Sequence, residues 1–247
     1  QPVVELSSGR LAGLEALARW RHPTRGLVSP VEFISVAEES GLVAPLERLL
    51  VRQACAAVRT WLLRRPLDGV RVSVNISSRQ LAEPGFVPRV ELTLREFELD
   101  PRRFVIELTE SSFIENAAAT RSTLRGLRDM GLLVALDDFG TGFSSLSHLT
   151  SFPIDILKID RSFTSHIEQD DRRARIVAAT IGLAHDLGLV VTAEGVETEA
   201  QRAFLAERGC EYAQGWLFDR APSAEATEER LDPSHRYLHR AGPASTA

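Results

Sequence analysis

The feature that most constrains the fold of this chain is a repeated alternation of short apolar segments with longer amphipathic ones. Strands are predicted at residues 3–6, 11–17, 70–75, 103–108, 132–137, 154–158, 189–194 and 212–214. Helical spacing of apolar residues follows most of these segments. Strands that alternate with helices at this spacing indicate a parallel sheet, and eight of them suggest a closed barrel. The 247 residues are a common length for a single α/β barrel.

The first two predicted strands form an exception to the parallel arrangement. Only residues 7–10 separate them, which is too short a connection for a crossover helix. We therefore predict an α/β fold, a TIM-like (β/α)8 barrel whose first strand is antiparallel. Residues 20–41 are polar and turn-rich, with a short helical patch near residues 33–39. Longer helices are predicted after Pro45 and near residues 86–97, 116–130, 172–187 and 199–208.

Charge and composition exclude several classes of protein. A net charge of −5 and a pI near 5.8 leave no dominant basic face, so we expect no nucleic acid polymer as a partner. The sequence has no signal peptide and no run of eighteen apolar residues, so we expect a cytoplasmic segment without membrane contact, although a parent protein could carry an anchor. Cys55 and Cys210 are predicted to be reduced, buried thiols.

Polar residues end seven of the predicted strands. They are Glu15, Asn75, Glu107, Asp137, Lys158, Glu194 and Gln214. Active sites of such barrels lie at the carboxyl ends of the strands. With Asp138 included, five carboxylates would face one lysine, and this crowding is costly without cations. Oxygen ligands of this kind suit Mg²⁺ or Mn²⁺, and two ions about 3.5 to 4 Å apart would suit phosphoester cleavage.

The two adjacent acids at the end of the fifth predicted strand need a change in backbone direction. Side chains alternate along a strand, so Asp137 and Asp138 point to one side only if the chain bends between them. We expect the loop Gly140-Thr141-Gly142 to permit this bend, because glycine adopts backbone angles closed to other residues.

Beyond these patterns, the sequence resembles a known family. Glu15-Ala16-Leu17, followed by Arg19-Trp20-Arg21-His22-Pro23, is similar to the signature of the EAL family of cyclic di-GMP phosphodiesterases. The resemblance continues in order through residues 74–77, 107–110, 137–146, 157–163, 193–198 and 214–218. The family fold is a barrel with its first strand reversed, as expected above from the short connection.

The resemblance also implies a domain organisation. It covers residues 1–222, and residues 223–247 are predicted to be a helix-prone segment and a tail. Family members usually have a helix before the first strand, which is missing here, so we expect a fragment of a longer protein fused to sensory or GGDEF-type domains. The resemblance further implies a possible homodimer through the loop after Asp138. Phe143 and Trp216 stand where the family often has tyrosine, and we expect a small effect.

Site roles follow from the same resemblance. One metal would be held by Glu15, Asn75, Glu107 and Asp137, and a second by Asp137, Asp138 and Glu194. Lys158 would hold the attacking water, and Glu194 is either a metal ligand or the general base. Leu17, Arg19, Asp160, Glu197 and Gln214 would bind substrate or line its pocket, with Arg19 at a phosphate. Glu110 would support catalysis by holding the loop after Asp138.

The implied reaction is hydrolysis of cyclic di-GMP to the linear dinucleotide pGpG by water activated between two metals. Ca²⁺ is expected to support binding and to inhibit turnover, because it is larger and less demanding of octahedral geometry. The alternative is a non-catalytic cyclic di-GMP receptor. Such receptors typically lose a metal ligand or the lysine, and the whole set is present here. A third interpretation, a barrel metalloenzyme acting on carbon acids, does not explain the ordered blocks.

Overall fold

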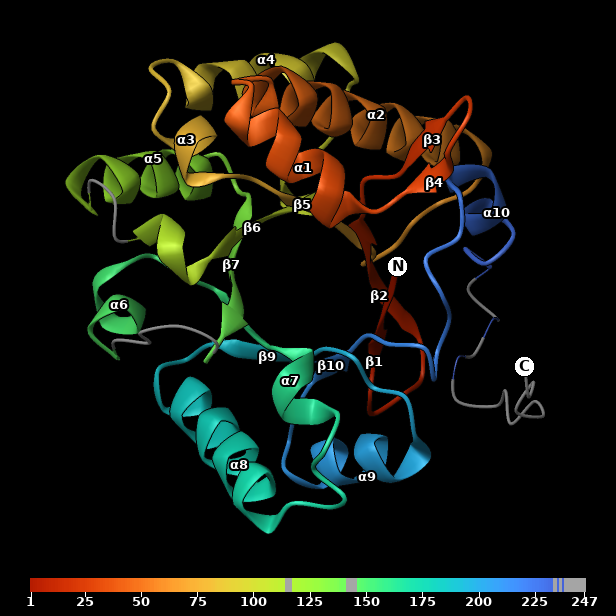
Figure 1. Cartoon of the computed structure of the whole chain (residues 1–247), viewed down its shortest axis with the longest axis vertical. Coiled ribbons are helices and arrows are strands. Elements are labelled where there is room, and N and C mark those ends of the chain that lie inside the picture. The colour runs from red at the N-terminus through yellow and green to blue at the C-terminus, as the bar shows by residue number, and fades with distance from the viewer. Residues whose placement is uncertain (114–116, 141–145, 233–234, 236, 238–247) are drawn as a thin grey trace.

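Eight strands close into a barrel in the computed structural model, which describes residues 1–113, 117–140, 146–232, 235 and 237 (Figure 1). Neighbouring strands follow the order β1-β10-β9-β8-β7-β6-β5-β2, and β2 pairs with β1 to close the ring. The barrel strands are β1 (Pro2–Glu5), β2 (Leu11–Ala16), β5 (Arg71–Asn75), β6 (Phe104–Thr109), β7 (Leu133–Phe139), β8 (Ile156–Ile159), β9 (Val190–Ala193) and β10 (Tyr212–Ala213). The predicted barrel is confirmed.

The orientation of β1 is also as predicted. β1 pairs antiparallel with both of its neighbours, through Val4 and Ala213 on β10 and through Val3 and Gly13 on β2. The other neighbouring pairs in the barrel are parallel. Parallel strands bring their carboxyl ends to one rim of the barrel, and this rim carries the candidate site.

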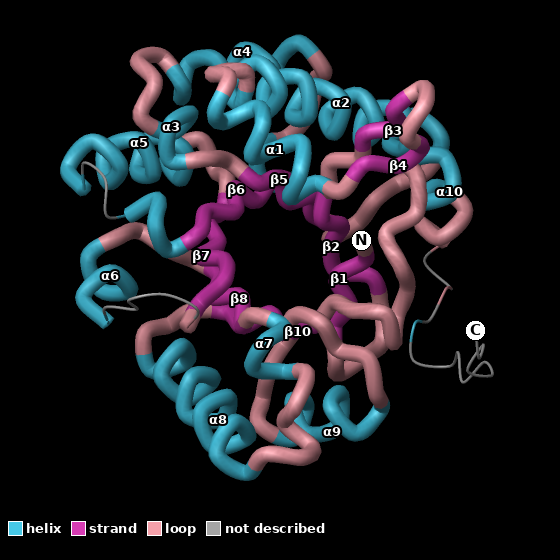
Figure 2. The backbone as a smooth tube through the Cα atoms, in the orientation of Figure 1, coloured by secondary structure: helices cyan, strands magenta, loops and turns pink. Residues whose placement is uncertain are grey.

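Helices form an outer layer around the strands (Figure 2). They are α1 (Pro30–Glu39), α2 (Val43–Arg64), α3 (Ser78–Leu81), α4 (Phe86–Glu96), α5 (Ala117–Asp129), α6 (Leu146–Ser151), α7 (Arg161–Thr164), α8 (Asp171–Asp186), α9 (Glu199–Glu207) and α10 (Ala224–Glu228), with short 3-10 turns at Pro101–Arg103 and Glu110–Phe113. None of the helices within the described residues is long and apolar enough to cross a membrane.

The core lies between the barrel and this layer of helices. Leu124 and Leu127 of α5 are fully buried, as are Val134 of β7 and Val177 of α8. Burial of apolar surface contributes roughly 25 cal/mol per Å², so the inward stripe of each helix holds it on the barrel. Cys55 and Cys210 are buried free thiols, as predicted.

Two local predictions were wrong. Residues 20–28 form a small antiparallel hairpin, β3 (Trp20–His22) and β4 (Gly26–Val28), where only a turn-rich segment was expected. The ring nitrogen Nδ1 of His22 accepts the backbone N–H of Thr24 at 3.2 Å, which stabilises the turn. Helix α2 begins at Val43, before Pro45, because proline fits the first turn of a helix.

Two described residues after Pro222 contact the rest of the fold. The carboxylate of Glu228 in α10 lies 2.6 Å from the guanidinium of Arg64 in α2. The backbone N–H of Tyr237 donates to the carbonyl of Gly9 at 3.0 Å. The division into domains at residue 222 stays a prediction.

Candidate metal and active site

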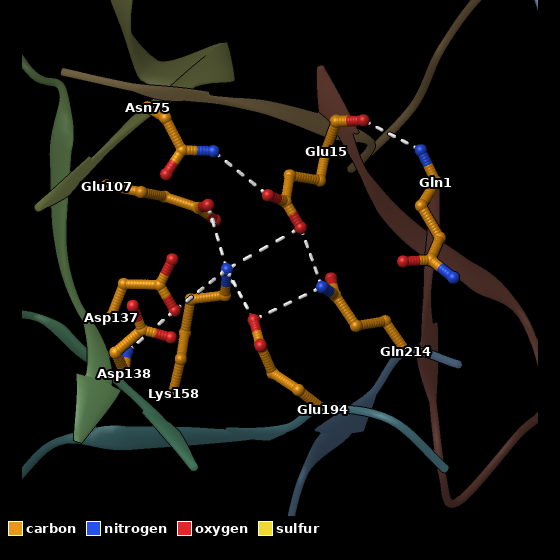
Figure 3. Close-up of polar contacts among 9 residues, drawn as sticks. All are labelled: Gln1, Glu15, Asn75, Glu107, Asp137, Asp138, Lys158, Glu194 and Gln214. Atoms are coloured by element: carbon orange, nitrogen blue, oxygen red, sulfur yellow. Dashed lines mark hydrogen bonds and ion pairs between the residues drawn. The ribbon is translucent and has the colours of Figure 1, made fainter. Parts of the chain in front are cut away.

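Eight polar side chains from seven strands of the barrel meet at its carboxyl rim (Figure 3). They are Glu15 on β2, Asn75 on β5, Glu107 on β6, Asp137 and Asp138 on β7, Lys158 on β8, Glu194 after β9 and Gln214 after β10. Each lies at or next to the carboxyl end of an apolar strand, which fixes its position. The structure therefore brings together the residues that the sequence placed at the strand ends.

Lys158 lies at the centre of this cluster and only 2% of its surface is exposed. Its Nζ is 2.6 Å from Oε1 of Glu194 and 2.8 Å from Oε2 of Glu107. Two further carboxylates are more distant, Asp137 at 3.3 Å and Glu15 at 3.6 Å. A single ammonium group thus faces four carboxylates, and their negative charge exceeds its positive charge.

The surplus of negative charge changes the pKa values of the cluster. Burial, together with the neighbouring carboxylates, raises the pKa of Glu107 and of Glu194 above the usual range. For Lys158, burial favours the neutral amine, but the surrounding carboxylates outweigh it and hold the pKa well above the usual value. Burial also acts to raise the pKa of Glu15, yet Lys158 and two hydrogen-bond donors lower it. Lys158 is therefore charged, and the surplus of negative charge is reduced mainly by protonation of Glu107 and Glu194.

Two amide side chains join the carboxylates on the other side of the cluster. Nε2 of Gln214 donates to Oε2 of Glu15 at 2.6 Å and to Oε1 of Glu194 at 3.2 Å. Nδ2 of Asn75 donates to the second oxygen of Glu15 at 3.0 Å. Glu15 is thus held from two sides, which fixes the direction of its carboxylate.

The bend between Asp137 and Asp138 occurs at Asp138 itself. Asp138 has a φ of 54°, in the left-handed region, and the pairing of β7 with β8 shifts between Leu136 and Phe139. Its backbone N–H donates to Oδ1 of Asp137 at 2.9 Å. The expectation that the glycine loop supplies the bend was wrong in this respect, because aspartate tolerates the left-handed region better than most residues. Residues 141–145 of that loop, including Phe143, lie outside the described residues.

Two overlapping groups of carboxylates have a geometry that could hold metal ions. Glu15, Glu107 and Asp137 form one group, and Asp137, Asp138 and Glu194 form the other, each with ligand atoms within 4.8 Å of one another. Both groups offer only oxygen, the donor that Mg²⁺ and Mn²⁺ prefer. Asp137 belongs to both groups, so the donor set fits a pair of divalent cations that share one carboxylate.

The remaining predicted site residues lie outside this cluster. Leu17 and Arg19 line a cavity of about 190 Å³ next to Glu15, and the exposed guanidinium of Arg19 donates to the carbonyl of Ala18 at 2.8 Å. The carboxylate of Asp160 caps α7 by accepting the N–H of Ser162 at 2.9 Å.

Two further acidic residues predicted for the site are not among the eight residues of the cluster. Glu197 pairs with Arg161 at 2.9 Å. Glu110 is buried in the turn after β6. Its expected role concerns the loop at 141–145, which is outside the described part of the chain.

One half-buried carboxylate beside the cluster was missed in the sequence. Glu47 of α2 contacts Ser77, two residues beyond Asn75. The signal was available, because Glu47 falls between Leu46 and Leu50 on the apolar stripe of a predicted helix. A charged residue on such a stripe is unusual and often has a specific partner.

Comparison with known proteins agrees with the geometry of the site. The sequence profile of the EAL domain matches residues 1–221. The chain belongs to the EAL domain family. The EAL profile thus spans the whole barrel and every residue of the cluster.

Curated EAL relatives are longer proteins. The chain is 40% identical over 225 residues to the bifunctional diguanylate cyclase/cyclic di-GMP phosphodiesterase MucR of Pseudomonas aeruginosa, covering 91% of this chain and 33% of MucR. It is 41% identical over 231 residues to the cyclic di-GMP phosphodiesterase NbdA of the same organism, covering 94% of this chain and 29% of NbdA. The chain thus spans about a third of the length of these EAL relatives.

Solved EAL structures have the same fold. The MucR phosphodiesterase in complex with c-di-GMP superposes with a TM-score of 0.86 at 40% identity, covering 92% of each chain. Klebsiella pneumoniae BlrP1, in a calcium/cy-diGMP complex, has a TM-score of 0.77 at 33% identity, covering 89% of this chain and 54% of BlrP1. The EAL fold of this chain is thereby shown.

Proposed function

We propose that this domain hydrolyses cyclic di-GMP to linear pGpG in a reaction that depends on two divalent cations. The observation that carries the proposal is the pair of carboxylate groups that share Asp137 beside the buried Lys158. Two metal ions that share a carboxylate suit phosphodiester cleavage, because they act on the attacking and the leaving oxygen. Relatives at 40% and 41% identity are named cyclic di-GMP phosphodiesterases.

The proposed ligands divide between two metal positions. Glu15, Asn75, Glu107 and Asp137 would hold one Mg²⁺ or Mn²⁺ ion, and Asp137, Asp138 and Glu194 the other. When bound, these ions would lower the pKa of water and stabilise charge on the phosphoryl oxygens. Asn75 would fulfil this role with its carbonyl oxygen, since its amide nitrogen already donates to Glu15.

Protein side chains would orient the attacking water and receive its proton. The ammonium group of Lys158 donates hydrogen bonds and would direct an oxygen lone pair of the water toward phosphorus. Glu194 lies 2.6 Å from that ammonium, so it can receive the proton of the same water. If Glu194 instead serves as a metal ligand, another group would accept the proton of the water. The two roles of Glu194 predict different pH dependences of turnover.

Substrate recognition is proposed for the rim next to β2. The guanidinium of Arg19 is exposed there, and it is suited to a phosphate because it presents a planar fork of donors. Leu17 and Gln214 would line the pocket near the reacting phosphate, while Asp160 and Glu197 would shape its far side. The bound c-di-GMP in the MucR structure supports a dinucleotide as the ligand class.

The decisive experiment is incubation of the protein with cyclic di-GMP and Mg²⁺, followed by chromatography for pGpG. We expect the linear product from the unsubstituted chain and none above background from Glu15→Ala. Tight binding of cyclic di-GMP without product would contradict hydrolysis and favour a receptor.

Calcium provides a second test of the proposed reaction. Ca²⁺ should occupy the same oxygen ligands but support little turnover, because its coordination is longer and less strictly octahedral than that of Mg²⁺. The calcium/cy-diGMP complex of BlrP1 supports binding of this kind in a relative. We expect added Ca²⁺ to inhibit the Mg²⁺-dependent reaction, and equal rates with the two ions would contradict this expectation.

Partners beyond the substrate are also proposals. The length of the curated relatives supports a domain that works within a larger polypeptide, with sensory or GGDEF-type neighbours in the cytoplasm. A homodimer through the loop after Asp138 stays a prediction. Sedimentation of the active protein would test it, since full activity of a monomer would show that dimerisation is dispensable.

A further inference from the structure

Glu47 is a carboxylate on α2 that faces the barrel and that the reaction described above does not use. Together with Leu46 and Leu50 it lines a cavity of about 160 Å³. Burial, with smaller contributions from the nearby carboxylates of Glu38 and Glu83, raises the pKa of Glu47 to about 7. A carboxylate that is partly removed from water loses hydration free energy, and it usually has a specific hydrogen-bond partner that compensates for this loss.

Both oxygens of Glu47 bind the same residue. Oε1 accepts the backbone N–H of Ser77 at 2.9 Å, and Oε2 accepts the Ser77 hydroxyl at 3.0 Å. The hydroxyl oxygen of Ser77 in turn accepts the N–H of Gln80 at 3.3 Å and so begins α3. Two hydrogen bonds fix both the position and the orientation of Ser77, where one would leave it free to rotate.

Ser77 lies two residues beyond Asn75, the last residue of β5. The strand ladder holds the chain only as far as Ile76, whose N–H donates to the carbonyl of Glu107 at 3.0 Å. The Asn75 side chain itself is exposed at the rim of the barrel, so packing does little to fix it. Beyond the ladder, the chain is held by the contact of Ser77 with Glu47.

Glu47 and Asn75 also line the same cavity, with Arg19 on its wall. Only Ile76 separates Ser77 from Asn75, so a shift of Ser77 would strain the last hydrogen bond of the ladder and turn Asn75 relative to Glu15, with which its amide forms a 3.0 Å hydrogen bond. Residues that support a metal ligand from outside the coordination sphere typically change metal affinity by about 10- to 100-fold when they are removed.

We propose that Glu47 is a positioning residue that clamps Ser77 and thereby directs the Asn75 amide toward Glu15 and the first metal position. The proposal rests on the proposed function, since it assigns Glu47 to the same site. It adds a residue of α2 to a site otherwise built from the strand ends.

The test compares Glu47→Ala, Glu47→Gln and Ser77→Ala with Glu39→Gln, a matched carboxylate on the exposed side of α1. Affinity for Mn²⁺ is measured by titration calorimetry without substrate, at a temperature where thermal melts show each variant folded. We expect Glu47→Ala to weaken Mn²⁺ binding about 10-fold. Glu47→Gln should restore most of the affinity, because its amide can still accept one hydrogen bond from Ser77 and donate another. Glu39→Gln should bind as the unsubstituted chain does.

The outcomes separate a positioning role from a purely structural one. Unchanged Mn²⁺ affinity in folded Glu47→Ala would overturn the proposal, even if the melting temperature falls. If Glu47→Ala does not fold, Ser77→Ala decides by the same criterion, because it removes the hydroxyl contact with Glu47, together with the cap of α3, and leaves the backbone contact in place. In turnover assays we expect a lower kcat with an unchanged KM for cyclic di-GMP.

The clamp and the proposed reaction can fail separately. The expected order of Mn²⁺ affinities in a chain that hydrolyses no cyclic di-GMP would support the clamp and contradict the phosphodiesterase. If the unsubstituted chain hydrolyses cyclic di-GMP and all the variants keep its Mn²⁺ affinity and its kcat, the result would support the phosphodiesterase and contradict the clamp. Absence of Mn²⁺ binding by the unsubstituted chain would overturn both.

Discussion

The Nζ of Lys158 lies 2.6 Å from Oε1 of Glu194, in a cluster where both side chains are largely buried. This contact joins β8 to the loop after β9. The positive charge of Lys158 favours the ionised form of Glu194, and the carboxylate of Glu194 favours the charged form of Lys158. We expect Lys158→Met, which keeps the length but loses the charge, to reduce turnover of cyclic di-GMP at least about 10³-fold. Product formation by chromatography measures the loss.

The same substitution should change how stability depends on pH. Without the ammonium group, the carboxylates repel one another more strongly as they ionise, so metal-free Lys158→Met should become less stable as the pH rises. Thermal melts at several pH values would show this trend. Turnover by Lys158→Met at the rate of the unsubstituted chain would contradict the assigned role.

Metal binding should release protons at neutral pH. The pKa values of Glu107 and Glu194 are raised by burial and by neighbouring carboxylates, so the metal-free protein holds protons that a divalent cation must displace. We expect Mn²⁺ affinity to increase with pH through the neutral range. Calorimetry at pH 7 in two buffers of different ionisation enthalpy should give different heats, and Glu194→Gln should reduce that difference. Equal heats in both buffers would refute proton release.

Asp138 should tolerate replacement by asparagine in the fold but not in the site. Asparagine adopts the left-handed region, where Asp138 has a φ of 54°, and it lacks the charge. We expect Asp138→Asn to fold normally and to bind one Mn²⁺ ion where the unsubstituted chain binds two. Asp138→Ala should in addition be less stable by about 1 kcal/mol, since alanine is strained at this φ. Two ions bound to Asp138→Asn with undiminished affinity would argue against a second metal at Asp138.

Gly215 should not tolerate a side chain, because its backbone packs closely against Val196, in the loop after Glu194. It has a φ of 156°, and a Cβ there would lie 2.1 Å from the carbonyl oxygen of Val196. We expect Gly215→Ala to lower the free energy of unfolding by about 2 kcal/mol or more. Gly182→Ala on α8 is the control, with no atom within 4 Å of its Cβ, and should stabilise the chain by about 0.5 to 1 kcal/mol. Denaturant melts that show equal effects would contradict this.

Much of the barrel could be predicted from the sequence, for physical reasons. Buried parallel strands are continuous apolar runs, so Val134 to Leu136 and their counterparts stand out, and the end of each run is marked by a polar residue such as Glu107. The short connection after β1 was enough to predict its reversed direction. Because the carboxyl ends of parallel strands converge, these two patterns also predicted the cluster at the rim.

The features that were missed have three different physical causes. The β3–β4 hairpin has too few apolar residues to show alternation, and its turn is stabilised by the ring of His22. The bend at Asp138 was assigned to the following glycines, because glycine is the more common residue in the left-handed region. The contact between Glu47 and Ser77 spans 30 residues, and no local pattern shows which partner a half-buried carboxylate has.

The hydrogen bond between Gln214 and Glu15 joins residues 199 positions apart. A nascent chain leaves the ribosome from its N-terminus, so Glu15 is available long before β10 and Gln214 have been synthesised. The barrel cannot close, and Glu15 cannot be held in its final direction, until nearly all of the domain has emerged. During translation, a partly synthesised chain therefore has most of its acidic residues but no complete site. A ligand of this site can bind only after the last strand, β10, has been synthesised and has paired.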